Sequence, residues 1–555
     1  MNLTKPESAA LLRHTSGLTT IRATQNKRPT APSLPSNPAL VKRRLLPFAL
    51  AFLSGLLLAL SFPRWELFPL AWVAFIPLFF AVRNVSAARS FLIGWTAGLV
   101  YFSGTLSWVT ISMTRYGKIP QPISYLLMLL LVAYCAIYVG LFAAASRSFF
   151  EKKRGWALLL IPALWVALEY ARGHLLSGFP WAALAYSQYR FLPLIQIADL
   201  ASIYGVGFLI VLVNVGLFEA IREGWIAHRM AWRELILAGG LFLLSLGYGL
   251  YRLDQPMGEE RSVTVAVVQG NIEQDQKWDA RLRDETVRKY KRLSLDSAEK
   301  GSTPPELIVW PESAAPFFFQ TEVALRNELL DFAQEGKFYL LFGSPAFTPA
   351  SSGQMALLNS AYLLSPAAEV VGRYDKIHLV PFGEYVPLSS ILFFVNKLVE
   401  GIGEFIPGRD ATVMEAAGTR VGTVICFEVI FPEVVRRFAQ NGATVMTTIT
   451  NDAWFGDSAA PYQHFSMVVF RSIENRVPFA RAANTGISGF IDAHGRIIKQ
   501  SPLFTEAALT QSLHPGIRRT LYTAYGDVFA IGCVIIALGF VLFSYREKRR
   551  KTDVD

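Results

Sequence analysis

Side chains suited to nucleophilic chemistry stand at the ends of apolar segments in the C-terminal half of the chain. Cys426 follows the apolar run VGTVI and precedes the helix-start pattern Phe-Pro-Glu at 431–433. A thiol at a strand end, near the N-terminus of a helix, ionises more easily than a free thiol. Glu312 follows the apolar segment LIVWP, and Lys376 leads into the loop HLVPFGEYVP, which carries Glu384. These residue types could supply a nucleophile, a base and a positive charge.

Each of these residues also has a structural interpretation. A single buried cysteine usually packs in a core, a carboxylate at a strand end can cap the chain, and a lone lysine is usually solvated or paired. Cys426 differs because Cys135 and Cys533 both fall within long apolar segments, so it is the one cysteine of the polar region. An unpaired thiol of this kind is a candidate nucleophile, and Glu428 stands two residues after it.

Long apolar segments indicate that much of the chain lies in a membrane. The 555 residues are 52% hydrophobic and only 17% charged, whereas soluble proteins carry about 25% charged residues. A helix needs about 20 mostly apolar residues to cross a bilayer. Eight segments meet or approach this length, at about 45–62, 66–82, 91–113, 123–145, 156–171, 192–220, 235–251 and 524–544. The sequence therefore predicts a seven-span membrane domain over 45–255 and a C-terminal transmembrane helix over 524–545.

The basic residues between these segments predict the orientation of the chain. Lys and Arg gather before the first segment, in every second loop and after the last segment. Because loops rich in Lys and Arg stay in the cytoplasm, both termini are expected there and the polar region 260–515 outside. Residues 1–44 are interpreted as a disordered basic cytoplasmic tail, and 546–555 as a second basic tail.

The charge and histidine patterns exclude several other functions. The net charge of +11 belongs largely to the loops and tails, and the polar region has no basic stripe with interleaved aromatic residues. We therefore expect no binding of nucleic acid. The seven histidines show no ligand spacing such as HxxxH, so neither a metal nor a cofactor is expected. A transporter should carry charged residues within its spans, where Asp199 is almost alone.

The region 260–515 alternates strand and helix patterns, which indicates a layered α/β domain. Apolar runs predict strands at 263–272, 307–313, 337–346, 359–366, 421–430 and 444–452. Helical patterns lie between them at about 277–299, 321–336, 432–441 and 461–477. The segment 488–500 is typical of a hairpin that turns at 493–495.

Taken together, Glu312, Lys376 and Cys426 resemble the Glu-Lys-Cys triad of the nitrilase superfamily. More closely, the chain resembles the apolipoprotein N-acyltransferases, the membrane-bound branch of that superfamily, over nearly all of its length after residue 45. The resemblance implies a membrane α-helical bundle of about eight spans with an α/β nitrilase-like αββα sandwich domain. Phe427 is a departure, because many members have Tyr there. The motifs that carry the resemblance are VVQGNIEQDQKW (267–278), VWPES (309–313), YDKIHLVPFGEYVP (374–387), ICFEVIFPE (425–433), TNDAWFGDS (450–458) and SGFPWAALAYSQ (177–188).

The resemblance also implies how the reaction proceeds. Cys426 would be the nucleophile, Glu312 the general base, and Lys376 the group that stabilises each oxyanion together with a backbone N–H near residue 427. Glu384 and Glu428 would orient Lys376 and the substrate amine. A phospholipid would donate its acyl chain to form a thioester. The α-amino group of the diacylglyceryl-modified cysteine that begins an apolipoprotein would then accept the chain.

Lipid substrates need apolar contacts, and two aromatic runs are candidates for them. Phe317 and Phe318 follow Glu312, and Phe393 and Phe394 follow the loop after Lys376. Either run could pack in the core or form an exposed loop that rests on the membrane. We favour exposed loops that admit acyl chains, because each run follows a catalytic element.

Three residues around the loop after the fifth apolar segment form a second candidate lipid site. Glu169, Arg172 and Trp181 are either simple anchors at a span end or, as the resemblance favours, contacts to phospholipid head groups. Together with the loop charges, the resemblance implies a monomeric enzyme of the bacterial inner membrane with a periplasmic catalytic domain. The remaining alternative is a membrane-tethered nitrilase-type amidase that uses water, which would need one span rather than eight.

Overall fold

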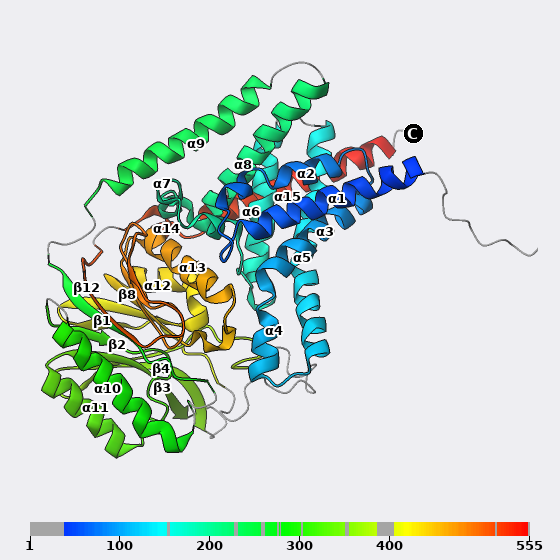
Figure 1. Cartoon of the computed structure of the whole chain (residues 1–555). Helices are drawn as coiled ribbons and strands as arrows, with labels where there is room; N and C mark the ends of the chain where they lie inside the picture. The colour runs from blue at the N-terminus through cyan, green and yellow to red at the C-terminus, as the bar shows by residue number, and fades with distance from the viewer. Residues whose placement is uncertain are drawn as a thin grey trace, which may run out of the picture. The chain divides into compact units, whose positions relative to one another are not determined.

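The computed structural model describes residues 38–152, 156–226, 231–256, 261–274, 277, 279–300, 303–349, 355–385, 405–516 and 519–552. The described residues from Leu46 onward form one compact unit. In this unit, an all-helical part precedes a part built on two β-sheets (Figure 1). The predicted tail over 1–44 lies mostly outside the described residues.

The helical part contains the apolar segments predicted from the sequence. Aromatic rings fill its interior: Phe75 packs on Trp165 with ring centroids 4.8 Å apart, and Phe79 packs on Phe218 at 5.5 Å. Each of the eight predicted segments contains helix. The helices are α1 (Pro38–Leu60), α2 (Phe75–Ala81), α3 (Ala87–Leu106), α4 (Val109–Ile111), α5 (Gln121–Lys152), α6 (Ala157–His174), α7 (Leu192–Ile195), α8 (Ala198–Ile226), α9 (Trp232–Leu253), α14 (Leu521–Tyr525) and α15 (Val528–Thr552).

Fewer helices are long enough to cross a membrane than the eight predicted. Within the described ranges, three are long and apolar enough: Gln121–Phe150, Ala198–Gly224 and Trp232–Leu253. Ala87–Leu106 and Val109–Tyr116, bent by 56°, make a fourth if they form one span. The prediction of eight spans is therefore not confirmed. Several of the apolar stretches include turns, which leave a helix shorter than the roughly 20 residues that a crossing needs. Among the residues searched, the shorter apolar stretches are Arg44–Leu60 within α1, Phe68–Ala81, and Val528–Phe543 within α15.

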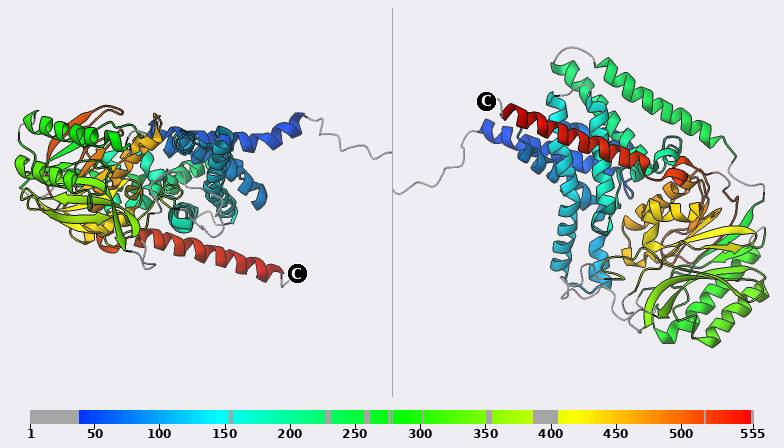
Figure 2. Two further views of the ribbon diagram at one scale, coloured as in Figure 1. Left: turned by 90° about the horizontal axis from the view of Figure 1, so that it is seen from below. Right: turned by 180° about the vertical axis from the view of Figure 1, so that it is seen from behind.

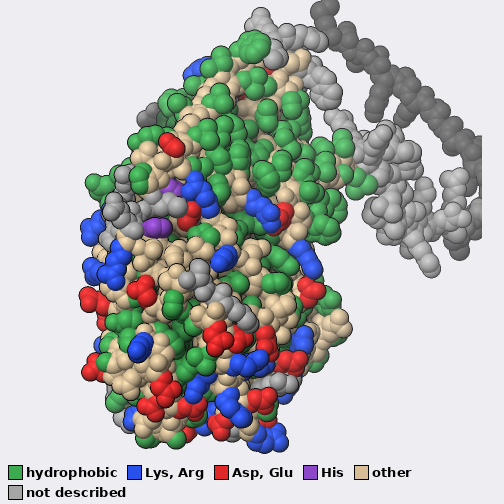
Figure 3. Space-filling view, turned by 60° about the vertical axis from the view of Figure 1, so that its left-hand side comes forward, with side chains coloured by type: hydrophobic (Ala, Val, Ile, Leu, Met, Phe, Trp, Pro, Cys, Tyr) green, Lys and Arg blue, Asp and Glu red, His purple; other side chains and the backbone are tan. Residues whose placement is uncertain are grey.

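The surface of this compact unit is divided by chemistry. On the face drawn in Figure 3, hydrophobic side chains gather over the helical part, and most charged side chains lie over the sheet part. On α9, Ile236, Leu243 and Leu244 are 67%, 64% and 72% exposed. A contiguous apolar surface of this kind needs a cover other than water. The helical part is therefore suited to a lipid bilayer.

Two six-stranded sheets form a sandwich with helices on both outer faces. The first sheet has the order β12 (Ala507–Leu513), β1 (Val263–Gln269), β2 (Leu307–Val309), β3 (Tyr339–Pro349), β4 (Met355–Leu364), β5 (Val370–Asp375). The second has the order β11 (Ile497–Gln500), β10 (Gly489–Ile491), β9 (Phe479–Ala483), β8 (Val445–Thr450), β7 (Thr419–Ile425), β6 (Val413–Ala416). The helices are α10 (Arg283–Lys300) and α11 (Val323–Gly336) on the first sheet, and α12 (Pro432–Gln440) and α13 (Ala460–Asn475) on the second. The predicted αββα arrangement is confirmed.

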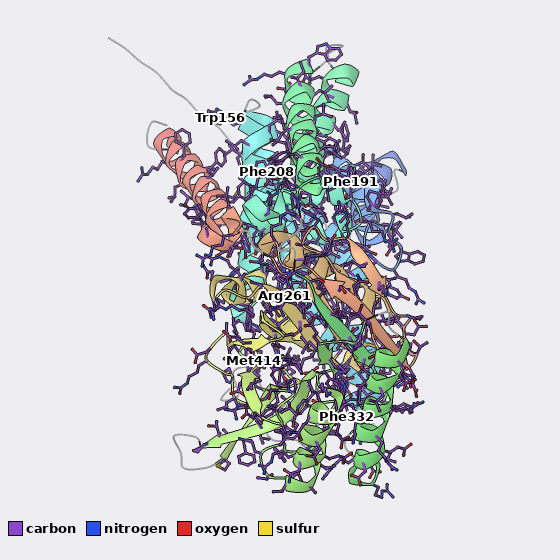
Figure 4. The ribbon with its side chains drawn as sticks, turned by 90° about the vertical axis from the view of Figure 1, so that its left-hand side faces the viewer. Trp156, Phe191, Phe208, Arg261, Phe332 and Met414 are labelled. Carbon is purple, nitrogen blue, oxygen red and sulfur yellow. The ribbon has the colours of Figure 1, made fainter. Side chains whose placement is uncertain are left out.

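The central strands explain why this part of the fold could be predicted. β1, β2 and β3 run parallel, as do β7, β8 and β9. Parallel strands covered on both faces appear in the sequence as continuous apolar runs. Phe332 of α11 covers part of the outer face of the first sheet. Figure 4 labels Phe332 on the sandwich and Phe208 on α8, in the helical part. The predicted hairpin at 488–500 is confirmed, because β10 pairs antiparallel with β11.

Buried polar contacts join the helical part to α13 of the sandwich. α8 breaks at Ser202, which has φ +55°. The Glu474 carboxylate accepts hydrogen bonds from the Ser202 hydroxyl at 2.6 Å and from the Ile203 N–H at 3.2 Å. Asp199, at the start of α8, pairs with Arg476 at 2.7 Å. These contacts hold the sandwich against the helices. Figure 2 shows the ribbon of both parts from two further directions.

Candidate active site

Cys426 lies at a sharp turn between a strand and a helix. β7 ends at Ile425, and Cys426 begins the short helix η7 (Cys426–Ile430), which leads into α12. Cys426 has φ +54°, a left-handed conformation that costs on the order of 1–3 kcal/mol for a residue other than glycine. Strain of this size persists only where the surroundings hold the residue, as active sites often do. The half-buried thiol is thus presented at a constrained position.

Glu312 follows β2 on the first sheet and is held by two asparagines. Its Oε1 accepts a hydrogen bond from Asn359 Nδ2 at 2.8 Å, and its Oε2 accepts one from the Asn451 backbone N–H at 3.1 Å. The backbone after Glu312 packs closely on Gly343: a Cβ added to Gly343 would lie 2.4 Å from the Ser313 nitrogen, so a larger residue there would displace this backbone. The Glu312 carboxylate is buried, and the protein orients both of its oxygens.

Lys376 follows β5 and is almost completely buried. Its Nζ lies 3.0 Å from Glu384 Oε1 and 3.8 Å from Glu312 Oε1. Asn359 Nδ2 donates to both of these carboxylates, at 2.8 Å each. Burial lowers the pKa of Lys376, but Glu384 and Glu312 outweigh it, so the net pKa is raised and the ammonium stays charged.

Burial and the neighbouring charges also shift the pKa of the Cys426 thiol. Burial and then the Glu312 carboxylate raise its pKa well above the ordinary value, while Lys376 lowers it. The thiol is therefore protonated at neutral pH and needs a base before it can attack. Glu312, Lys376 and Cys426 thus lie close enough to interact, although they follow strands of two different sheets.

Glu428 is fully buried and binds the protein rather than facing a substrate. Burial raises its pKa to about 7, and its hydrogen bonds act against this rise. Its contacts connect the backbone before Cys426 with the loop after Lys376, so it positions the two segments. The expected contact with a substrate amine is not supported by this position. Its donors, at 2.7–3.0 Å, are the Tyr374 hydroxyl and the N–H groups of Ile377, His378 and Ile425.

Three further polar residues of the site were not predicted from their residue types. Asn359 and Asn451 hold the Glu312 carboxylate, and Lys277 Nζ donates to the Glu312 carbonyl at 2.7 Å. Burial lowers the pKa of Lys277 to about 8, against the attraction of Glu312 and Cys426. Lys277 and Asn451 fall within the motifs at 267–278 and 450–458, which is the signal that could have identified them. Asn359 lies in a mostly apolar strand, next to Ser360, and gives no such signal.

The aromatic run after Glu312 is not the exposed loop that the sequence suggested. Phe317 is 3% exposed and Phe319 is 2% exposed, and both belong to the core on the outer side of the first sheet. The chain is turned inward there because the Ser344 hydroxyl donates to the Phe317 carbonyl at 2.6 Å. Phe318 is half-buried. The second run, with Phe393 and Phe394, lies outside the described residues.

The residues predicted to contact head groups are also inside the protein. Glu169, Arg172 and Trp181 are 5%, 3% and 0% exposed. Arg172 Nη1 donates to the carbonyls of Phe179 and Trp181 at 2.7 Å each, and Glu169 Oε1 accepts from the Leu184 N–H at 2.8 Å. A head group cannot reach side chains that are buried in this way. They hold the loop after α6 in place instead, so direct contact with lipid is not supported.

The arrangement is suited to covalent acyl transfer. A protonated thiol on a strained turn, a fixed carboxylate and a buried ammonium supply a nucleophile, a base and a charge that can stabilise an oxyanion. Phe427 packs on Phe431, with ring centroids 5.2 Å apart, and brings no hydroxyl to the site. In the part of the chain that the structure describes, no group of three or more His, Cys, Asp or Glu side chains could hold a metal ion.

Family models match both parts of the chain. Residues 54–216 match the apolipoprotein N-acyltransferase N-terminal domain, and residues 264–520 match the carbon-nitrogen hydrolase domain. The chain is 47% identical to an apolipoprotein N-acyltransferase of Geobacter metallireducens over 505 residues, which cover 90% of this chain and 96% of the relative. It is 31% identical to an apolipoprotein N-acyltransferase of Haemophilus influenzae over 515 residues, with 90% and 96% covered.

A solved structure also resembles part of the chain. A mutant of the amidase from Nesterenkonia sp. AN1 is 19% identical, covers 49% of this chain and 95% of its own, and has a TM-score of 0.35. The sequence relatives, in contrast, match through both the helical part and the sandwich. The chain belongs to the apolipoprotein N-acyltransferase family.

Proposed function

We propose that this protein transfers a fatty acyl chain from a phospholipid, through a thioester on Cys426, to the α-amino group of a diacylglyceryl-modified apolipoprotein. The observation that carries the proposal is the cluster in which Glu312 lies 3.8 Å from Lys376 while both act on the Cys426 thiol. The match of residues 54–216 to the family's N-terminal domain supports lipid acyl transfer over hydrolysis by a tethered amidase.

In the first half of the reaction, Glu312 takes the thiol proton as sulfur attacks the ester carbonyl of the phospholipid. The carbonyl oxygen becomes an oxyanion, which Lys376 Nζ and the backbone N–H of Phe427 stabilise. When the intermediate collapses, the bond between the carbonyl carbon and the ester oxygen breaks. The departing lysophospholipid oxygen receives the proton from Glu312, and the acyl chain remains on Cys426 as a thioester.

In the second half, the α-amino group of the apolipoprotein attacks the thioester carbonyl. Glu312 takes a proton from the amine, and the same donors stabilise the second oxyanion. Collapse breaks the carbon–sulfur bond, and Cys426 recovers its proton from Glu312. Glu384 and Asn359 keep Lys376 in place throughout, because both contact the Lys376–Glu312 pair. Each cycle therefore returns the three residues to their starting protonation states.

The membrane arrangement belongs to the same proposal. We propose eight crossings with both termini in the cytoplasm and the sandwich in the periplasm, on the inner membrane, as the loop charges predict. The segments 45–255, 260–515 and 524–545 would then be the membrane domain, the catalytic domain and the last crossing, between basic tails. The protein would act as a monomer, and the exposed apolar side chains of α9 would face lipid.

A reconstituted transfer assay tests this function. Purified protein in mixed micelles receives a phospholipid with a labelled acyl chain and a synthetic diacylglyceryl-cysteine lipopeptide. Mass spectrometry is expected to detect the N-acylated lipopeptide with the wild type and none with Cys426→Ala, because the nucleophile is lost.

The matched control for this assay is the same lipopeptide with its α-amine acetylated, which should not accept an acyl chain. Release of free fatty acid at the rate of donor consumption, without any acylated lipopeptide, would contradict transfer and favour hydrolysis.

A further inference from the structure

His464 of α13 is a fully buried histidine that touches the backbone of the nucleophile. Its Nε2 lies 3.2 Å from the Cys426 carbonyl oxygen. Its Nδ1 lies 3.1 Å from Asp452 Oδ1 and 3.1 Å from Arg481 Nη2. None of the roles given above to Glu312, Lys376 or Cys426 uses this side chain.

The partners of His464 determine where its proton lies. The Cys426 carbonyl can only accept a hydrogen bond, so Nε2 must carry the hydrogen. Burial and then the charge of Arg481 lower the pKa of His464, while the Asp452 carboxylate acts against them. Nδ1 lies 3.1 Å from both the Asp452 carboxylate, which can only accept, and the Arg481 guanidinium, which can only donate. In either protonation state of Nδ1, His464 presents its Nε2–H to the Cys426 carbonyl.

An ion pair lies against the Nδ1 edge of the ring. Asp452 Oδ2 pairs with Arg481 Nη2 at 2.7 Å, and Asp452 Oδ1 accepts from the Thr450 hydroxyl at 2.9 Å. Burial raises the pKa of Asp452, but Arg481, His464 and Thr450 outweigh burial and hold it below its usual range. The buried carboxylate and guanidinium therefore fix the orientation of the imidazole from this edge.

A residue of the helical part packs on a face of the His464 ring. Trp181 stacks on His464 with ring centroids 5.7 Å apart and an interplanar angle of 25°. The Trp181 Nε1–H donates to Gln463 Oε1 at 2.7 Å, and both side chains are buried. The position of the imidazole is therefore fixed from the sandwich on one side and from the helical part on the other.

The peptide bond after Cys426 connects this contact to the chemistry. Because a peptide group is planar and trans, the Cys426 carbonyl and the Phe427 N–H point in opposite directions from one rigid plane. A donor that fixes the carbonyl also fixes the direction of the N–H. Cys426 needs such a restraint, since its φ of +54° is strained and a relaxed backbone would rotate this plane.

We propose that His464 is a positioning residue for acyl transfer: its Nε2–H holds the Cys426 carbonyl so that the Phe427 N–H points at the developing oxyanion. This inference rests on the proposed function, since it concerns the oxyanion of that reaction. Trp181, Asp452 and Arg481 act through His464, by holding the ring in place with Nε2 toward the Cys426 carbonyl.

A matched pair of substitutions separates this role from simple packing. In His464→Gln the side-chain amide can place an N–H where Nε2 stood, whereas in His464→Asn the amide reaches only the position of Nδ1. Two rates are measured on Cys426 of the purified full chain in mixed micelles. One is acyl-enzyme formation from phospholipid alone, and the other is alkylation by iodoacetamide. Alkylation forms no oxyanion, so it reports only on the thiol.

The expected result is that His464→Asn slows acyl-enzyme formation at least about tenfold, as loss of an oriented oxyanion donor should, while alkylation changes less than about twofold. His464→Gln should recover most of the acylation rate. Equal acylation by His464→Asn and the wild type would overturn the inference alone. Parallel loss of both rates in both variants would also overturn it, because that pattern indicates a packing defect. Absence of acyl-enzyme in the wild type would overturn the proposed function and this inference together.

Discussion

Glu312→Gln is expected to slow acyl transfer by about a hundredfold or more, because the amide cannot take the proton from a thiol whose pKa is raised. The substitution keeps the size of the side chain. It also disturbs one hydrogen bond. Asn359 and the Asn451 N–H each donate to one oxygen of the carboxylate, whereas the amide of Gln has only one oxygen that can accept. Steady-state rates with a labelled phospholipid and a lipopeptide acceptor measure the loss.

The matched control for Glu312→Gln is Glu322→Gln, which changes an exposed carboxylate before α11 and should leave the rate unchanged. Melting temperatures of both variants show whether folding is affected. If Glu312→Gln kept more than half of the wild-type rate, another group would have to be the base, and the assignment of Glu312 would be wrong.

Lys376→Met is expected to reduce both activity and stability. Loss of an oxyanion-stabilising charge should lower the rate by about 10²–10³-fold. The same change leaves Glu312 and Glu384 buried without their cation, and breaking a buried ion pair costs about 3–5 kcal/mol of the free energy of unfolding. Thermal melting and the transfer assay measure the two effects separately.

The double substitution Lys376→Met with Glu384→Gln separates stability from chemistry. Removal of the Glu384 charge takes away the uncompensated carboxylate nearest to position 376, so part of the lost stability should return. The rate should stay low, because no charge has been restored to the oxyanion site. Recovery of the transfer rate together with the melting temperature would mean that Lys376 is only structural.

Glu312 and Cys426, which we propose as catalytic, could be found from the sequence because each follows an apolar strand, whereas Lys376 was found from the loop that follows it. Glu312, Lys376 and Cys426 follow β2, β5 and β7, and strands of a layered sandwich bring their ends together in space. β5 itself was not predicted, because its residues are mostly half-buried or exposed and show no apolar run. The groups that hold the catalytic side chains, such as Asn359, could not be identified, since one polar residue in a strand does not reveal its partners.

The membrane part was harder to predict than the sandwich. Hydropathy identifies apolar stretches but not where a helix bends or breaks, as α8 does at Ser202. Burial was also misjudged at Phe317 and at Arg172, because local sequence does not show which face of a loop the rest of the protein covers. Asp199, which hydropathy places in a span, is paired with Arg476, which directly follows α13 and lies more than 200 residues away in the sequence.

The central claim is that Cys426 becomes acylated by a phospholipid. Intact-protein mass spectrometry of the purified chain, incubated with phospholipid and no acceptor, measures this directly. We expect an added mass equal to one acyl chain, mapped to Cys426, removed by neutral hydroxylamine and absent in Cys426→Ala. An unmodified Cys426 under conditions in which the same preparation acylates a lipopeptide would contradict the thioester mechanism.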